Sequence, residues 1–339
     1  MKYRTLGKSG IRVSRLGIGG SAFAGGVFHR DDRAARELLL EGIDRGINFI
    51  DTSDNYAMGR SETLIGEVLR NRRSDIVIAT KGGARFTRMG RLGLAARPVL
   101  RPFRLVLKPA RRWLNLQRDS HKHYVYDTSN LREAIEASLR RLGTDYIDVY
   151  QLYNPVPEAA GLSEAFEFLK RLKSEGKARC VGISVNHVDD ARGIFKMWTP
   201  DTVQFPLSLL DQAARRGFLQ ASSRLGIGLI ARSVLAQGIL TDAEGHVMAD
   251  QSSHLSVQTL RAWRAQRDKY RCLVRPDRTL AQAALCFVLQ QPEVAVALVG
   301  AVSGTELREN LGADSAPALN APDMLRIDTI FAGAREDPR

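Results

Sequence analysis

The feature that most constrains this chain is an alternation, repeated eight times, between a short apolar run and a stretch with helical periodicity. The apolar runs, which we predict to be strands, span residues 12–20, 47–53, 75–81, 146–153, 178–184, 201–208, 226–235 and 295–302. The amphipathic stretches, which we predict to be helices, span residues 32–46, 61–70, 130–143, 162–176, 188–198, 211–226, 279–291 and 305–313. Such an alternation is typical of a parallel sheet covered by helices.

The predicted strands are rich in Val, Ile and Leu without strict polar alternation, a pattern typical of strands buried on both faces. Eight units with no Gly/Ser linker or shift in composition favour one closed (β/α)8 barrel of TIM type, with residues 1–339 as a single domain. The opening YRTLGKSGIRV predicts a hairpin that caps the bottom of the barrel. Ser129 is the predicted N-cap of the helix at 130–143.

Composition excludes several classes of protein. Apolar residues make up 44% of the chain and charged residues 26%, which excludes wholesale disorder. The chain has no run of about 18 uncharged apolar residues that would span a membrane. Its start contains Lys and Arg throughout and lacks a signal-peptide core. Three scattered cysteines form neither a disulfide framework nor a metal-ligand spacing, so we expect a cytoplasmic protein without a metal.

The positive charge is concentrated in one insert after the third predicted strand. The net charge is +13, from 50 basic and 37 acidic residues, and residues 84–125 contain eleven of the bases against one acid. The insert mixes Arg with Leu, Val, Phe103 and Trp113. It is interpreted as a solvated lid or partner surface, as a peripheral contact with anionic lipid, or as a lid over a phosphorylated or carrier-bound substrate. No nucleic-acid partner is expected, because the basic patch is borne by a loop and no recognition module is present.

Polar residues gather at the carboxyl ends of the predicted strands, which is where barrels of this type place their chemistry. These residues are Asp51, Lys81, Tyr153, Ser184, Gln204, Ser233 and Gly300, and Tyr56 follows Asp51 by a short loop. One interpretation of Asp51 and Lys81 is a structural salt bridge. The other is chemical: a Lys ammonium, held by Asp51, lowers the pKa of a nearby phenol, which then passes a proton to a carbonyl oxygen.

Several segments together resemble the aldo-keto reductases over essentially the whole chain. They are GINFIDTSDNYAMGRSETLIGEVL (46–69), ATKGG (79–83), DYIDVYQLYNP (145–155), CVGIS (180–184), VQFPLSLLD (203–211), RSVLAQGIL (232–240) and LVGAVSGTELRENLGA (298–313). The resemblance implies a reductase that binds a nicotinamide nucleotide without a Rossmann domain. The GIGG at 17–20 is accordingly interpreted as a turn at the barrel top and not as a dinucleotide fingerprint.

Three catalytic residues of the family are matched in this chain, and a fourth is replaced by another residue type. Asp51, Tyr56 and Lys81 match the family pattern, whereas Tyr153 stands where the family has a histidine that binds the carbonyl oxygen. Three readings follow: a reductase with a reshaped pocket, a different redox reaction on the same cofactor, or a weakly active nucleotide-binding sensor. A membrane-docked accessory protein is a further alternative. The intact set of three favours an enzyme with a small-molecule, carrier-linked or lipid-linked carbonyl substrate.

The same resemblance implies three sets of cofactor contacts. Ser184 and Gln204 match residues that bind the nicotinamide carboxamide. Four residues match the pyrophosphate loop: Ser233, Leu235, Gln237 and Gly238. Four more fall at the adenosine end: Gly300, Ser303, Glu306 and Asn310. Members selective for the 2′-phosphate place cations where this chain has Val302 and Glu306, so the cofactor is expected to be NADP(H) or NAD(H), with poor discrimination or a preference for NADH.

Overall fold

A computed structural model of the chain describes residues 1–21, 32–86, 122–242 and 255–333. Eight strands, each paired in parallel with its neighbours, form a closed barrel in which the last strand pairs with the first. These strands are β3 (Leu16–Gly19), β4 (Phe49–Asp51), β5 (Val77–Gly82), β8 (Ile147–Tyr153), β9 (Ala178–Ser184), β10 (Thr202–Pro206), β11 (Gly228–Arg232) and β12 (Val294–Val299). The predicted (β/α)8 barrel is confirmed.

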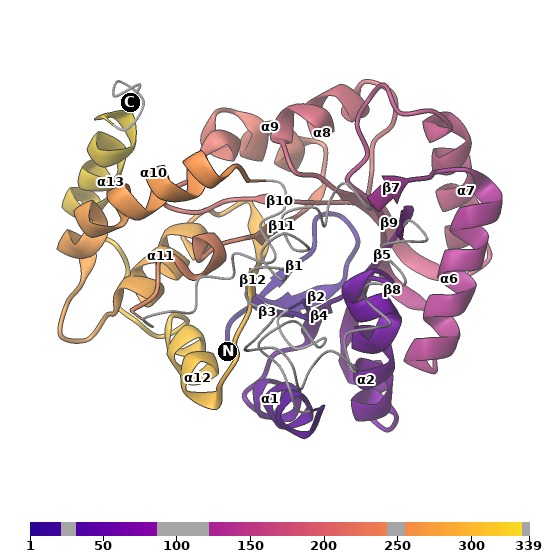
Figure 1. The fold of residues 1–339 in the computed structure, drawn as a ribbon, viewed down its shortest axis with the longest axis horizontal. Coiled ribbons are helices and arrows are strands. Elements are labelled where there is room, and N and C mark those ends of the chain that lie inside the picture. The colour runs from indigo at the N-terminus through magenta and orange to yellow at the C-terminus, as the bar shows by residue number, and fades with distance from the viewer. Residues whose placement is uncertain (22–31, 87–121, 243–254, 334–339) are drawn as a thin grey trace, which may run out of the picture.

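Helices lie around the outside of the strands (Figure 1). Those that follow barrel strands are α1 (Asp32–Asp44), α2 (Arg60–Leu69), α6 (Thr128–Leu142), α7 (Leu162–Ser174), α8 (Val188–Phe195), α9 (Phe218–Arg224), α11 (Leu280–Leu289) and α12 (Gly304–Gly312). Within the described ranges, the sequence analysis did not predict α10 (Val257–Arg267) or α13 (Ala321–Gly333). Short 3-10 helices are η1 (Tyr56–Gly59), η2 (Arg73–Asp75), η4 (Ala213–Arg215), η5 (Ala236–Gly238) and η6 (Asp268–Leu273).

Three local predictions differ from the structure. The apolar run 12–20 is two strands, because the chain leaves the hairpin after Ser14 and enters the barrel at Leu16. The helix expected at 211–226 is broken at Gly217, whose φ of 77° lies in the left-handed region. The N-cap of α6 is Asp127 and not Ser129, because the Asp127 carboxylate accepts the backbone N–H of Asn130 at 2.9 Å.

The bottom of the barrel is closed by the predicted hairpin, β1 (Tyr3–Thr5) and β2 (Arg12–Ser14), which pair antiparallel. Leu6, Ile11 and Val13 of this hairpin pack into a second apolar core, separate from the one between strands and helices. That inner core also contains Phe49, Val77, Ala79, Val149, Cys180, Ile230, Ala295, Val296 and Leu298. Apolar side chains therefore fill the lower half of the barrel, which leaves the opposite end for polar groups.

The basic insert begins and ends in a two-stranded antiparallel ribbon, β6 (Ala84–Phe86) and β7 (Lys122–Tyr124). The residues between these strands, on which the lid and lipid-contact interpretations depend, lie outside the described residues. Among the residues that the structure describes, no helix combines the length and apolar character needed to span a membrane.

Candidate active site

An ion pair between neighbouring strands lies at the carboxyl end of the barrel. Lys81 Nζ at the end of β5 donates to Asp51 Oδ1 of β4 at 2.6 Å and to the carbonyl of Thr52 at 2.8 Å. The same Asp51 oxygen accepts a 2.7 Å hydrogen bond from Gln204 Nε2 on β10. Asp51 and Lys81 are only 2% and 1% exposed. Three strands thus share one carboxylate oxygen in the barrel interior.

Tyr56 lies beside this pair on η1, the short helix that follows β4. Lys81 Nζ is 5.2 Å from the centroid of the Tyr56 ring. The next two residues, Ala57 and Met58, have positive φ values of 49° and 56°. Non-glycine residues rarely adopt this left-handed backbone, and such strain concentrates at functional sites.

The expected lowering of the Tyr56 pKa is wrong. Burial raises the pKa of the Tyr56 phenol well above its usual value, and the nearby Tyr153 and Asp51 add to this effect. Burial also lowers the pKa of the Lys81 ammonium, while Asp51 opposes that change. The desolvation of the phenolate outweighs the attraction of the nearby Arg232 guanidinium, which acts in the opposite direction. The phenol therefore stays protonated, which is the state of a proton donor.

Tyr153 ends β8 and pairs in register with Ser184 of β9. Its ring stacks on that of Tyr124, which belongs to the insert ribbon, with centroids 6.2 Å apart. The Tyr126 hydroxyl donates to the Tyr153 carbonyl at 3.0 Å. Tyr153 is therefore fixed by the segment that joins the insert to α6, a link that the sequence did not reveal.

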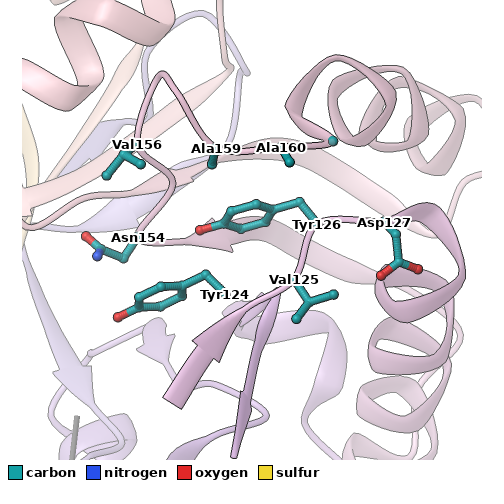
Figure 2. A pocket seen from close by; sticks show the side chains of 9 residues that line it. Tyr124, Val125, Tyr126, Asp127, Asn154, Val156, Ala159 and Ala160 are labelled. Atoms are coloured by element: carbon teal, nitrogen blue, oxygen red, sulfur yellow. The ribbon is translucent and has the colours of Figure 1, made fainter. Parts of the chain in front are cut away.

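A pocket of about 410 Å³ is lined in part by Tyr124 and Tyr126. In Figure 2 the rings of Tyr124 and Tyr126 point the same way, toward the side on which Asn154 lies. The remaining lining residues are Val125, Asp127, Val156, Ala159, Ala160 and Gly161. Apolar and aromatic groups thus surround a hollow directly beside the end of β8.

A second polar network joins the ends of β8, β9 and β11. Ser184 Oγ donates to Gln204 Oε1 at 2.9 Å, so the predicted carboxamide pair is in contact. Asn154 Oδ1 accepts the backbone N–H of Asn186 at 3.0 Å, and Asn186 Oδ1 accepts from Arg232 Nη2 at 2.7 Å. The sequence analysis gave Arg232 no role, although a charged residue that ends a buried apolar strand was the available signal.

The predicted pyrophosphate loop has an unusual backbone. Ser233, Ala236 and Gln237 have positive φ values of 57°, 48° and 62°, and Gly238 follows at 87°. The Ser233 hydroxyl accepts from Arg232 Nη1 at 3.1 Å. Leu235 is buried beneath the loop, and its carbonyl accepts the N–H of Gly238 at 3.0 Å. Left-handed residues within a tight turn are the kind of backbone that forms anion-binding concavities.

At the predicted adenosine end, a carboxylate of α12 accepts a hydrogen bond from the backbone just before that helix. Glu306 Oε2 accepts the backbone N–H of Val302 at 2.9 Å, and Ser303 Oγ accepts the N–H of Glu306 at 3.2 Å. Asn310 Nδ2 donates to the carbonyl of Gly300 at 3.1 Å. Arg308, the one basic residue of this helix, is paired with Glu41 at 3.0 Å. Within the described residues, no group of His, Cys, Asp or Glu side chains has the arrangement of a metal site.

Comparison with known proteins decides the family. The model of the aldo/keto reductase family matches residues 15–332. This chain belongs to the aldo/keto reductase family. Members of that family are NAD(P)-dependent oxidoreductases that act on carbonyl and alcohol groups, so the reductase interpretation of the sequence is confirmed at this level.

Individual relatives agree with the family assignment. An uncharacterized oxidoreductase of Bacillus subtilis, YqkF, is 29% identical over 334 residues, covering 97% of this chain and 96% of that protein. An NADH-specific methylglyoxal reductase of Escherichia coli is 29% identical over 331 residues, covering 92% and 93%. The holo structure of the aldo-keto reductase AKR11C1 from Bacillus halodurans is 27% identical with a TM-score of 0.75, covering 97% and 96%.

The described residues fit a nicotinamide carboxamide. Gln204 Nε2 donates one of its two hydrogens to Asp51, and Ser184 donates its hydrogen to Gln204. The pair therefore retains one amide donor and the acceptor lone pairs of one hydroxyl. A carboxamide offers the complementary carbonyl acceptor and NH2 donor, so this aldo-keto reductase has side chains of the right chemistry at the predicted positions.

A partly buried carboxyl close to this site, that of Asp54, was not anticipated. Burial and the neighbouring Glu62 raise the pKa of Asp54 to about 7. Glu62 is itself fully buried and fixed by Thr80 at 2.6 Å and Arg141 at 2.7 Å. Asp54 accepts from Ser53 Oγ at 3.1 Å. Asp54 is thus the second carboxyl of a crowded pair and titrates near neutral pH.

We expect Asp54→Asn to gain stability over the wild type as the pH rises. The Asp54 pKa is higher in the folded state, so the folded state binds this proton more tightly than the unfolded chain does. The stabilisation of the folded state by this proton is complete below about pH 4 and is lost as the pH approaches 7. The variant should gain about 1–2 kcal/mol between pH 4.5 and pH 8, since the partial exposure of Asp54 reduces the full effect.

Urea unfolding of both proteins at the two pH values measures this difference. Asp75→Asn, at an exposed carboxyl, is the matched control and should change stability equally at both. A constant difference between Asp54→Asn and the wild type would contradict the assignment.

Proposed function

We propose that this chain, folded as one domain, reduces a carbonyl substrate with NAD(P)H and that Tyr56 donates the proton to the carbonyl oxygen. The observation that supports this most directly is the Tyr56 phenol beside a Lys81 ammonium that is hydrogen-bonded to Asp51. The nucleotide, when bound, supplies a hydride to the carbonyl carbon. A weakly active nucleotide-binding sensor is disfavoured, because such a protein has no need of this arrangement.

Each residue of the proposed mechanism has a separate task. Burial keeps the Tyr56 phenol protonated until the substrate oxygen gains negative charge. The Lys81 ammonium then stabilises the phenolate that remains after the proton has left. Asp51 holds Lys81, and Gln204 fixes Asp51 from across the barrel. The Tyr153 hydroxyl takes the place of the family histidine as the second donor to the substrate oxygen.

Replacement of the proton donor tests this role. Tyr56→Phe should lower kcat by about 10²–10⁴ while leaving nucleotide affinity almost unchanged, because only the acidic hydroxyl is removed. Turnover of methylglyoxal with NADH, together with nucleotide titration by fluorescence, gives both quantities. Retained activity would assign proton transfer to another group, and Tyr153→Phe would then be examined next.

We propose a preference for NADH, or little discrimination between NADH and NADPH. Ser184 and Gln204 hold the carboxamide, the loop at 233–238 holds the pyrophosphate, and Gly300, Ser303 and Asn310 shape the adenosine end. The carboxylate of Glu306 occupies the N–H of Val302 at the start of α12 and would repel a 2′-phosphate. The relative named as an NADH-specific methylglyoxal reductase supports the same choice.

Glu306 is therefore the position at which cofactor preference should change. We expect Glu306→Arg to shift the ratio of kcat/KM values toward NADPH by about 1–3 kcal/mol, the scale of a charge-assisted contact. Glu306→Gln is the matched control, since it can keep the acceptor for Val302 while removing the charge, and should shift the ratio less. A wild-type preference for NADPH above about a hundredfold, or about 2.7 kcal/mol, would contradict this proposal.

The proposed substrate is larger than a simple aldehyde and amphipathic or anionic, such as a carrier-linked or lipid-linked carbonyl compound. Support comes from the pocket lined by Tyr124 and Tyr126, because the Tyr124 ring also stacks on that of Tyr153 and so places the pocket near the end of β8. Binding energy from remote parts of a substrate is used to position its reacting carbon. Peripheral contact between the insert and anionic lipid remains the companion proposal for presenting such a substrate.

Shortening the insert tests this proposal. Replacement of residues 88–118 by a short Gly/Ser bridge leaves the paired residues of β6 and β7 in place. We expect unchanged NADH affinity and a loss of at least about tenfold in kcat/KM for decanal, with methylglyoxal little affected. Equal losses for both aldehydes, or none, would show that the insert does not contact substrate. Tyr153→His is the companion variant and should raise activity on methylglyoxal.

A further inference from the structure

Arg232 is the last residue of β11 and a partly buried cation at the barrel mouth. Its guanidinium donates to the carbonyl of Val185 at 2.9 Å, to Asn186 Oδ1 at 2.7 Å and to Ser233 Oγ at 3.1 Å. All three acceptors are uncharged. Within the described part of the chain, no carboxylate lies within 4.0 Å of this guanidinium. Its charge is therefore not neutralised by an ion pair.

The hydrogen bonds of Arg232 limit what else it can bind. A guanidinium grips an anion with two parallel donors, and both of its two-donor edges that face outward include Nη2. Here both Nη2 hydrogens are used, by Val185 and Asn186. A bidentate contact with a carboxylate or phosphate is thus already blocked. The flat faces of the guanidinium are not used by these bonds, and such faces stack on planar rings.

The residues around Arg232 show where its guanidinium lies in the proposed site. The acceptors Val185 and Asn186 directly follow Ser184, and Arg232 pairs in register with Pro206, two residues beyond Gln204. Ser184 and Gln204 are the proposed carboxamide residues. Burial lowers the pKa of Arg232, while Tyr153, Tyr56, Asp211 and Asp51 oppose this change, so the guanidinium lies within electrostatic range of both tyrosines and of these two carboxylates. The cation is therefore enclosed between the nicotinamide residues and the proton donor.

We propose that Arg232 faces the nicotinamide ring and makes this site select the reduced nucleotide over the oxidised one. This inference rests on the proposed function. The oxidised ring carries a positive charge, whereas the dihydronicotinamide ring is neutral. Two cations in a partly buried site repel each other more strongly than they do in water. The held, unpaired guanidinium thus weakens binding of NAD(P)⁺ and leaves NAD(P)H stacked on its face, which favours release of the oxidised nucleotide after reduction.

Equilibrium binding tests the inference without turnover. Dissociation constants for NADH and NAD⁺, and for NADPH and NADP⁺, are measured by calorimetry on the full chain. The wild type should bind each reduced form at least about tenfold more tightly than its oxidised form. Arg232→Met should reduce this ratio about tenfold, chiefly by tightening NAD⁺ binding, whereas Arg232→Lys should keep most of it. Arg179→Met, which removes a cation from the other end of the barrel, should leave the ratio unchanged.

The outcomes separate the two proposals. Equal wild-type affinities for the two redox states overturn the selection by Arg232, even if Arg232→Met fails to fold. A wild-type preference that survives unchanged in Arg232→Met overturns it as well. In both cases nucleotide binding is still observed, so the proposed function is not contradicted. If neither nucleotide binds with a Kd below about 1 mM, both the proposed function and the inference fail.

Discussion

The buried ion pair between Asp51 and Lys81 is the interaction on which the upper half of the barrel depends. Removing two charges from water is costly, and their attraction offsets this only when the remaining lone pairs and hydrogens also find partners. Here the Thr52 carbonyl and the Gln204 amide supply those partners. Because β4, β5 and β10 all contribute, the network fixes the spacing of strands that lie across the barrel from one another. It also sets the position of the Lys81 ammonium under the Tyr56 ring.

The two ends of the barrel are stabilised by different interactions. At the bottom, Leu6, Ile11 and Val13 of the hairpin close an apolar core that needs no polar partner. At the top, hydrogen bonds replace that packing, and the backbone after the strands is strained at Ala57, Asn154 and Gln237. Strained backbone persists only where its surroundings hold it in place. The packed lower core thus holds in place an upper end whose backbone conformation is fixed by hydrogen bonds.

Sequence patterns predicted the barrel well for a definite reason. Most barrel strands are short apolar runs that end in a polar residue or glycine, so the pattern marks both the strand and its functional end. The break after Ser14 was missed because a single residue, Arg15, separates β2 from β3 and no Gly or Pro marks the break. The cap at Asp127 was missed because two adjacent oxygens, those of Asp127 and Ser129, both suit the position.

The candidate site shows where such prediction ends. The sequence predicted that the charged pair Asp51 and Lys81 lies beside Tyr56, but the direction of the Tyr56 pKa shift depends on burial, which no local pattern contains. For the same reason Asp54 and Arg232 went unnoticed: their properties arise from what surrounds them. Once the surroundings are known, the same kind of interaction, electrostatic repulsion, is expected at both ends of the proposed nucleotide site. A cation held at the nicotinamide end disfavours a positive ring, and a carboxylate held by Val302 at the adenosine end disfavours a further phosphate. Repulsion at both ends would thus account for the two selectivities that we propose, since every form of the nucleotide shares the same amide and pyrophosphate.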